Sequence, residues 1–533
     1  MQNGEDAPVI IAGGGLVGLS TAMFLAQRGV KSLVIERLTE PSTVPRAAFF
    51  HMRTFELFRQ AGIEDQVREQ SQKEFTPDGA IIAVESLAGK ELAAFIPSLN
   101  EGVEKLSPCR RWFVSQPGLE PILRKRAQEI GAQFVNGLEV VGAEQDDEGV
   151  TVIARDVGSG EERRFRGRYM VDCEGAHSKV RDQLGIQMLG RGVFSNSITI
   201  YFRANLAPFL VGRNLSIIYI NNPTLGGFFR LEKSSARGFL VVNTVGDPLA
   251  DPEAAANVAA DVSETRLIEL IRASAGDPDI PVEIEGCARW RCTSDVAERL
   301  SDGRIFLAGD SAHLMPPNGG FGGNTGIHDA HNLAWKLDLV LRGVAGPGLL
   351  DSYSVERQPV GKFTVDQAYA RYVTRTAAYL KAKDAPPYQD DFLIELGYIY
   401  RSGAVLTEPG APTAPEDPHG SHGRPGTRAP HLWVQHEGRR VSTLDLVGVG
   451  FTLFAGPDGG AWQAAAETAG AATGAPIAFH QPGAEVAEAY GLQASGASLI
   501  RPDGFVAWRA PTAPADPSGA LTEVLRTMLA KAG

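Results

Sequence analysis

The chain has 533 residues, of which 43% are hydrophobic and 21% are charged, and its formal net charge is −12. Such a length exceeds one ordinary hydrophobic core and predicts two or three domains, and the composition is typical of a globular protein in solution. The negative charge argues against nucleic acid and against anionic membrane surfaces as main partners.

The cysteines give no sign of a metal or redox centre. The four of them form no C-x-x-C motif, and none lies in a metal-ligand pattern: Cys109, Cys173, Cys287 and Cys292. We therefore expect no metal and a reduced, cytoplasmic protein.

The first apolar segment, residues 9–37, admits three interpretations: a membrane anchor, a nicotinamide site or a flavin site. Glu5 and Asp6 precede the segment and no Lys or Arg does, which argues against a signal peptide. Glycines interrupt the apolar run after a β-branched start, and an apolar strand pattern returns at residues 32–36. The segment therefore predicts a strand, a tight turn, a helix and a second strand rather than a membrane helix.

Glycine spacing within this unit predicts a dinucleotide site. Gly13 can take the turn, Gly15 lets a pyrophosphate approach the backbone, and Gly18 lets helix and strand pack closely. Glu36 ends the second strand about twenty residues on, where an acid accepts a ribose hydroxyl. The motif predicts binding of ADP and leaves the other half of the dinucleotide open.

Residues 190–300 contain several runs that alternate in polarity, such as "NSITIYFRANL" and "LSIIYINNPT", and these predict antiparallel strands. Aromatic side chains and one arginine on these runs are candidates for an apolar substrate pocket, although each alone is more often plain core. The candidates are Tyr201, Arg203, Tyr219, Phe228 and Trp290.

Residues 304–341 predict a second cofactor-binding element. A short strand over 304–307 leads to Asp310, and a loop with two prolines and four glycines leads to a helix from about Asn324 to Leu341. An acid at a strand end can bind a ribityl hydroxyl, and backbone N–H groups at a helix start can face the edge of a flavin ring.

The remainder of the chain predicts a linker and a further unit. Residues 360–400 have a helical pattern that Ala385-Pro386-Pro387-Tyr388 interrupts, and residues 407–430 are rich in Pro, Gly and Thr. Strand-like runs follow, with helices between them.

Four segments, in order, resemble the single-component FAD-dependent aromatic hydroxylases of the para-hydroxybenzoate hydroxylase class. They are "VPRAAFFHMRTFELFRQAGI", "SQPGLEPILRKRAQE", "YMVDCEGAHSKVRDQLGI" and "GRIFLAGDSAHLMPPNGGFGGNTGIHDAHNLAWKL". The long form of the chain is similar to phenol, hydroxyphenylpropionate and aromatic polyketide hydroxylases. The resemblance covers residues 8–405 and extends more weakly to the end.

This resemblance implies an α/β fold in three parts. A Rossmann-like FAD-binding domain takes residues 1–189 and 288–370, and an antiparallel-sheet substrate domain takes residues 190–287. A helical segment and linker follow over 371–430. Residues 431–533 resemble a thioredoxin-like C-terminal domain, and because no cysteine follows Cys292, a structural or oligomer-forming role is expected there.

The resemblance also assigns cofactor contacts. FAD, bound noncovalently, is expected to contact Gly13, Gly15, Gly18, Glu36, Arg37, Arg46, Gln116, Glu174, Asp310, Pro317, Gly320, Gly322, Gly323 and Asn324. Glu174 departs from the family pattern, which has Asp there, and this places a nicotinamide contact in doubt. Arg181, which can reach back to the same turn, is an equally good candidate.

The implied activity is hydroxylation of an aromatic ring with O2 through a flavin C4a-hydroperoxide, with NADPH or NADH docking transiently as the reductant. The absence of a second G-x-G-x-x-G unit and of a C-x-x-C motif argues against a disulfide reductase. The substrate is expected to be a phenolic or pyridinol compound or an aromatic polyketide, with a homo-oligomer possible. The alternatives are a catabolic phenol or hydroxyphenyl hydroxylase and an FAD-binding oxidase that does not hydroxylate.

Two residues are the catalytic candidates. His51 follows Arg46 in the segment that approaches the pocket, and it could accept the proton of a substrate hydroxyl. The alternative for His51 is a residue at the start of a helix, bonded to the backbone. Arg46 is expected near the pyrophosphate and the flavin.

Overall fold

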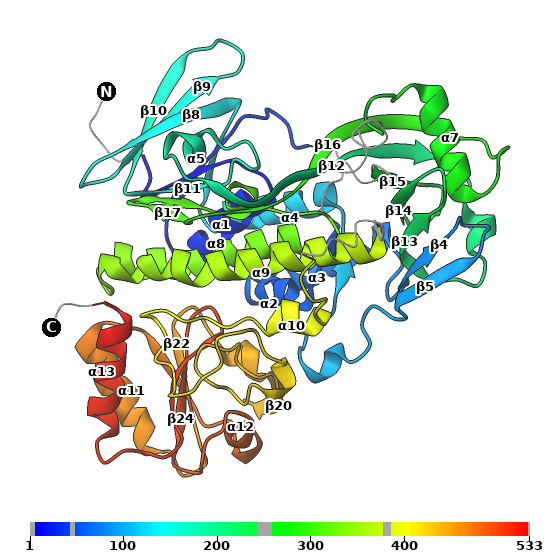
Figure 1. The fold of residues 1–533 in the computed structure, drawn as a ribbon. Helices are drawn as coiled ribbons and strands as arrows, with labels where there is room; N and C mark the ends of the chain where they lie inside the picture. Colours follow the sequence, from blue (N-terminus) through cyan, green and yellow to red (C-terminus); the bar gives the residue numbers. More distant parts are fainter. Residues whose placement is uncertain (1–5, 43–47, 244–257, 377–384, 531–533) are drawn as a thin grey trace.

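A computed structural model describes residues 6–42, 48–243, 258–376 and 385–530. Arg46, one of the two catalytic candidates, lies outside the described residues. Figure 1 shows long helices across the middle of the molecule, two sheet regions above them and a C-terminal unit below.

The first sheet confirms the predicted strand–turn–helix–strand unit. Its strand order is β17-β18-β11-β1-β2-β7, and β1 pairs in parallel with β2 and with β11. The strands are β1 (Val9–Ala12), β2 (Ser32–Glu36), β7 (Gln133–Asn136), β11 (Tyr169–Asp172), β17 (Ser301–Asp302) and β18 (Ile305–Leu307). Within the described ranges, no helix combines the length and the apolar character needed to cross a membrane.

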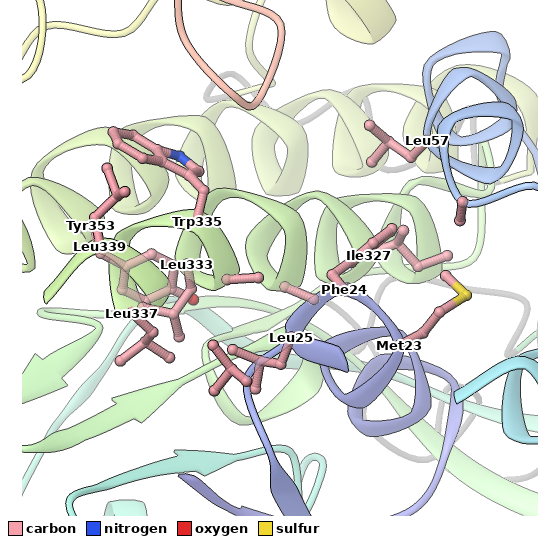
Figure 2. Close-up of a cluster of buried hydrophobic side chains, with 14 of the residues drawn as sticks. Met23, Phe24, Leu25, Leu57, Ile327, Leu333, Trp335, Leu337, Leu339 and Tyr353 are labelled. Atoms are coloured by element: carbon pink, nitrogen blue, oxygen red, sulfur yellow. The ribbon is translucent and has the colours of Figure 1, made fainter. Parts of the chain in front are cut away.

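Helices cover this sheet and build the main core. They are α1 (Leu16–Gln27), α2 (Met52–Gln60), α3 (Glu64–Glu74), α4 (Gln116–Glu129), α5 (Lys179–Gln183), α8 (Phe321–Leu341) and α9 (Asp351–Arg375). Figure 2 shows Phe24 and Leu25 of α1 beside Ile327 and Leu333 of α8, and all four side chains are buried. Because α8 follows the proline- and glycine-rich loop, this packing fixes the loop against the first sheet.

A small sheet, β10-β9-β8, lies at the edge of the first one (Figure 1). Its strands are β8 (Leu138–Gln145), β9 (Val150–Asp156) and β10 (Glu162–Gly167). A two-stranded ribbon of β3 (Phe49–Phe50) and β6 (Trp112–Phe113) joins the start of α2 to the segment before α4.

The larger sheet has eight strands in the order β19-β16-β12-β15-β14-β13-β4-β5. They are β4 (Ala80–Val84), β5 (Glu91–Ile96), β12 (Met188–Arg203), β13 (Leu215–Asn221), β14 (Gly226–Leu231), β15 (Arg237–Asn243), β16 (Glu283–Ala297) and β19 (His313–Leu314). The predicted strands are present, whereas β4 and β5 were not anticipated. The expected domain boundaries at 189/190 and 287/288 fall inside β12 and β16, because these two long strands pair from the first sheet outward.

The two faces of the large sheet differ in composition. One face packs on α7 (Glu264–Ala275) and is aliphatic, with Ile198, Ile200 and Leu240 among its buried residues. The opposite face is aromatic: Tyr219 and Phe228 pack there with Phe49 and Phe113 of the β3–β6 ribbon. The aromatic face therefore adjoins the segments that lead into α2 and α4.

The C-terminal unit contains a four-stranded sheet, β23-β22-β24-β25, with a parallel β22–β23 pair. Its elements are α10 (Asp391–Leu396), β20 (Trp433–His436), β21 (Arg439–Ser442), β22 (Phe451–Ala455), α11 (Ala461–Thr473), β23 (Ile477–His480), α12 (Ala484–Ala489), β24 (Ala497–Ile500), β25 (Val506–Ala510) and α13 (Pro517–Met528). The predicted strand-like runs of this region are confirmed.

A buried ion network connects this unit to the central helices. Arg501 donates two hydrogen bonds to Glu356 of α9, at 2.5 and 2.8 Å, and two more to Asp503. Lys336 of α8 donates to the same Glu356 carboxylate at 2.8 Å. Arg53 of α2 donates to the backbone oxygen of Asp503. Residues 501–505 thus contact three helices from the first part of the chain.

Candidate active site

Of the three motif glycines that follow β1, only one has space for a side-chain Cβ. Gly13 has φ of +96°, and a Cβ there would overlap the backbone oxygen of Cys173. A Cβ at Gly18 would overlap the backbone oxygen of Gly13. A Cβ at Gly15, the residue before the first turn of α1, would meet nothing closer than Glu120 Oε1 at 3.8 Å. Gly13 and Gly18 are therefore glycines because the backbone packs closely around them. Gly15 borders an open space at a helix N-terminus, where anions bind readily.

Glu36 reaches this turn from the end of β2. Its carboxylate accepts hydrogen bonds from the backbone N–H of Gly14, at 2.5 Å, and of Leu38, at 2.8 Å. Arg37 is exposed beyond the strand end. Gln116, at the start of α4, donates to Glu120 at 2.6 Å. Because Glu120 is also the nearest group to the space at Gly15, Gln116 and Glu120 flank that space; the sequence interpretation did not single out Glu120.

Glu174 lies in a turn that is crowded with carboxylates. Burial, together with the neighbouring Asp172, raises the pKa of Glu174 to about 8. Asp172 is fully buried and accepts hydrogen bonds from Ser178 Oγ and Ser311 Oγ. Arg181 donates to Ala176 O at 3.2 Å, so its predicted reach back to the turn is confirmed. The hydrogen bond from Ser311 Oγ to Asp172 connects this turn to residues 309–311.

Asp310 is exposed in a short 3-10 turn, Gly309–Ser311, directly after β18. Its neighbour Gly309 donates its N–H to Asp329 of α8 at 3.1 Å. Asp329 is fully buried, and it also receives hydrogen bonds from His313 and Arg357, each at 2.7 Å. Asp329 had no obvious signal in the sequence, because an acid in a helical run usually indicates a solvated face.

The glycine loop turns sharply into α8. Pro317 is exposed, its backbone oxygen accepts the N–H of Gly320, and Gly319 and Gly320 have φ of +91° and +68°. Gly320 directly precedes α8, and Gly322 and Gly323 lie half-buried in its first turn. A Cβ at Gly322 would meet only Met315, at 3.8 Å. The space at this second helix start is therefore at Gly322, whereas Gly320 is packed against Phe49.

Asn324 joins the glycine loop to the start of α2. Its side-chain amide donates to Phe49 O and Gly320 O, and its side-chain oxygen accepts the His51 N–H at 2.9 Å. It also accepts a hydrogen bond from Thr54 at 2.6 Å. All these contacts lie within the chain, so Asn324 fixes the glycine loop and the start of α2 relative to each other.

His51 is bonded to the glycine loop. The ring is 2% exposed, and Nε2 lies 3.0 Å from Gly319 O; because a carbonyl only accepts, Nε2 carries the proton. Burial lowers the pKa of His51, so the ring is neutral. His51 directly precedes α2, and its side chain makes no capping hydrogen bond. The structure thus brings His51 to the loop as a donor to backbone.

Tyr219 contacts the same loop through Asn318. Asn318 Nδ2 is 3.5 Å from the Tyr219 hydroxyl and donates to Thr376 Oγ1 at 3.0 Å. Arg375 at the end of α9 is 3% exposed, and although burial opposes its charge, nearby Tyr219 and Asp391 raise the pKa of its guanidinium overall. The sequence predicted Tyr219 but missed Arg375, which lies in a helical run far from any motif.

The other predicted pocket residues lie on the same sheet but are not equivalent. Phe228 and Tyr219 have ring centroids 5.7 Å apart, and Trp290 donates to Thr199 Oγ1 at 3.0 Å. Tyr201 contacts Phe239 edge to face at 6.3 Å. Arg203 has a 57% exposed side chain and pairs with Glu285, so it lies at the solvent-facing end of β12.

Gly15 and Gly322 lie at the starts of two helices that pack on each other, and each leaves space of the kind that a dinucleotide cofactor can occupy. Residues 6–368 match the FAD binding domain family, and residues 422–532 match the aromatic-ring hydroxylase C-terminal family. The chain belongs to the FAD-dependent aromatic-ring hydroxylases.

Relatives of known activity match over almost the whole length. The chain is 48% identical to 4-methyl-5-nitrocatechol 5-monooxygenase of a Burkholderia species, over 99% of this chain and 98% of that protein. It is 38% identical to tetracenomycin A2 monooxygenase-dioxygenase of Streptomyces glaucescens, over 99% and 97%. The crystal structure of aklavinone-11 hydroxylase with FAD and aklavinone superposes with a TM-score of 0.93 and 36% identity, over 99% of this chain and 100% of that one.

Proposed function

We propose that the protein is an FAD-dependent monooxygenase that uses NADPH or NADH and O2 to hydroxylate a phenolic ring. The observation that carries the proposal is the glycine loop, which contacts His51 through Gly319 and Tyr219, with Arg375 beside it, through Asn318. A ring between this loop and the aromatic sheet face would lie beside the helix start that borders the flavin.

The residues present fit FAD at both helix starts. The Cβ position of Gly15 has Glu120 Oε1 as its nearest neighbour, at 3.8 Å, and that of Gly322 has only Met315, at 3.8 Å, so both leave space for a ligand. Glu36, Arg37 and Gln116 would hold the ADP and ribityl parts, and Asp310 with Glu174 would border the centre of the cofactor. When bound, FAD supplies the activation of O2 and the transfer of one oxygen atom.

The protein must also activate the substrate phenol. Arg375 provides a buried positive charge beside the Tyr219 hydroxyl, and such a pair would stabilise negative charge on a substrate oxygen. His51 is the second candidate, with Nδ1 as its basic atom because Nε2 is bonded to Gly319 O. This bond favours a role for His51 in positioning the loop, and Tyr219 with Arg375 as the activating pair.

The large sheet is proposed to be the substrate domain, and the C-terminal unit to be thioredoxin-like. Support for the first comes from the aromatic face over the β3–β6 ribbon. Support for the second comes from a parallel β22–β23 pair with antiparallel β24 and β25. Without a cysteine after Cys292, the C-terminal unit would stabilise the central helices rather than carry electrons.

The experiment is a turnover assay with the FAD-loaded protein. Candidate phenols are 4-methyl-5-nitrocatechol and aromatic polyketides such as aklavinone, because relatives of both kinds match the whole chain. We expect NAD(P)H oxidation that depends on the phenol, with one oxygen atom from labelled O2 in the product. Hydrogen peroxide as the sole product with every phenol would identify an oxidase instead.

A further inference from the structure

Arg230 of β14 is a buried cation on the aromatic face of the large sheet. Its residue is 4% exposed, and its direct cross-strand partner is Phe239, which packs with the cluster around Tyr219 and Phe228. Cross-strand partners share one face of a sheet. Arg230 therefore belongs to the same face as the proposed substrate residues.

Two aromatic rings fix the orientation of this guanidinium. Its central carbon lies 3.9 Å from the centroid of Phe75 and 3.6 Å from that of Phe113. Phe113 is itself stacked on Phe49, with centroids 4.6 Å apart, and a Cβ at Gly320 would lie 3.0 Å from Phe49. Stacked rings thus connect Arg230 to the glycine loop, and they leave only its edges for hydrogen bonds.

One edge of the guanidinium has no partner. Nη1 donates to Ser216 O, whereas Nε and Nη2 are buried and have no hydrogen-bond partner among the described residues. Ser216 Oγ is likewise buried without a partner. A buried unpaired charge is costly, and buried donors in native proteins almost always have acceptors.

The nearest counter-charge is already engaged. Glu74 is the one acidic group that favours the charged form of Arg230, yet its two oxygens accept Gln70 Nε2 and Ser115 N, each at 2.6 Å. Burial consequently lowers the pKa of Arg230 to about 9, and the group remains a cation at neutral pH. Among the described residues, no acceptor contacts Nε or Nη2, and an oxygen-bearing ligand could supply one.

We propose that Arg230 binds a planar two-oxygen group, a carboxylate or a nitro group, on the aromatic substrate. The Nε and Nη2 atoms present two parallel N–H bonds, which match such a group in a bidentate contact. The proposal rests on the proposed function and narrows its substrate class to phenols that carry this substituent.

The test measures binding to the FAD-loaded protein, not turnover. Wild type and Arg230→Met are titrated at neutral pH with 4-nitrocatechol, 3,4-dihydroxybenzoate and catechol, and the change in flavin absorbance gives each Kd. We expect wild type to bind one of the two substituted probes more tightly than catechol. In Arg230→Met that probe should bind about 10- to 100-fold more weakly, as for other charge-assisted contacts, with catechol nearly unchanged.

The substituted probes distinguish nitro from carboxylate recognition, and Arg237→Met is the matched control. Arg237 lies on the same sheet with a 51% exposed side chain, paired with Glu285. An equal loss for all three probes in Arg230→Met, or an unchanged preference, would overturn the proposal, as would wild type binding catechol best. Failure of the proposed function would appear differently, as turnover without hydroxylated product.

Discussion

Two buried arginines in this protein have opposite surroundings. Arg501 contacts the carboxylates of Glu356 and Asp503, so its charge is compensated within the chain. Arg230 is held between two phenyl rings, and one of its edges has no acceptor among the described residues. The difference teaches that buried charge alone does not point to a binding site, and that the proposal for Arg230 depends on its unpaired edge.

Removal of Glu356 tests the compensated centre and should have the largest effect. Glu356→Ala leaves Arg501 and Lys336 buried without their shared carboxylate, and we expect a loss of about 3–5 kcal/mol in the free energy of unfolding. Urea unfolding followed by circular dichroism measures it. Glu162→Ala, in an exposed pair with Arg155, is the control and should change stability by less than about 1 kcal/mol. Equal losses of stability in Glu356→Ala and Glu162→Ala would mean that the buried network matters no more than an exposed ion pair.

A substitution at Gly15 tests whether the space at the start of α1 is a binding site, as the Arg230 comparison tests an unpaired charge. Gly15→Val would fill the space at the start of α1, whereas the neighbouring chain has no contact to lose there. We expect the purified variant to fold and to carry almost no FAD, as measured from flavin absorbance per protein. Gly460→Val is the control, because Gly460 has no neighbour within 4 Å of its Cβ position, and this variant should keep full FAD occupancy. Retained FAD in Gly15→Val would make the glycine a turn residue only.

Variants at Tyr219 and His51 test whether each side chain contacts the substrate or only other parts of the protein. Tyr219→Phe should lower product formed per NAD(P)H consumed and slow hydroxylation by about 10²-fold, as for other lost acid–base groups. His51→Ala removes a bond to the loop backbone, so we expect a stability loss of about 1 kcal/mol with coupling preserved. Product yield and melting curves, measured on both variants, separate the roles. A reversed pattern would return His51 to the role of base.

Glu174 is a carboxyl group that burial and a neighbouring carboxylate keep protonated at neutral pH. Its pKa is raised from 4.5 to about 8 by burial and by Asp172, so the folded state holds a proton that the unfolded chain releases. This contribution to stability is fully present below about pH 4.5 and is lost as the pH rises through about 8. The melting temperature should therefore decrease between about pH 4.5 and 8 more steeply in wild type than in Glu174→Gln. Parallel curves would show that Glu174 ionises normally.

The smallest effect is expected for the stability of Arg230→Met. Because the cation has an unsatisfied edge, its replacement by an apolar side chain should leave the free energy of unfolding within about 1 kcal/mol of wild type, or raise it. The same urea titration as for Glu356→Ala provides the measurement. A loss as large as in Glu356→Ala would mean that Arg230 is a structural residue after all.

The local motifs were predictable because they depend on neighbouring residues. The strand–turn–helix unit, strands β12 to β15 of the large sheet and the helix after the glycine loop follow from spacing and alternation, and the structure contains them. Partners distant in sequence were not predictable: Arg375 beside Tyr219, Asp329 beneath Gly309, and the unpartnered edge of Arg230. Nothing in a local pattern distinguishes these charged residues from ordinary surface residues.

The contact of residues 501–505 with the first helices has a consequence for how the protein is made. Arg53 and Asp503 are separated by 450 positions, yet they are hydrogen-bonded. During synthesis α2 leaves the ribosome long before its partner exists, and contacts so distant in sequence form late and slowly. The central helices therefore acquire the support of residues 501–505 only after the C-terminal unit has been synthesised.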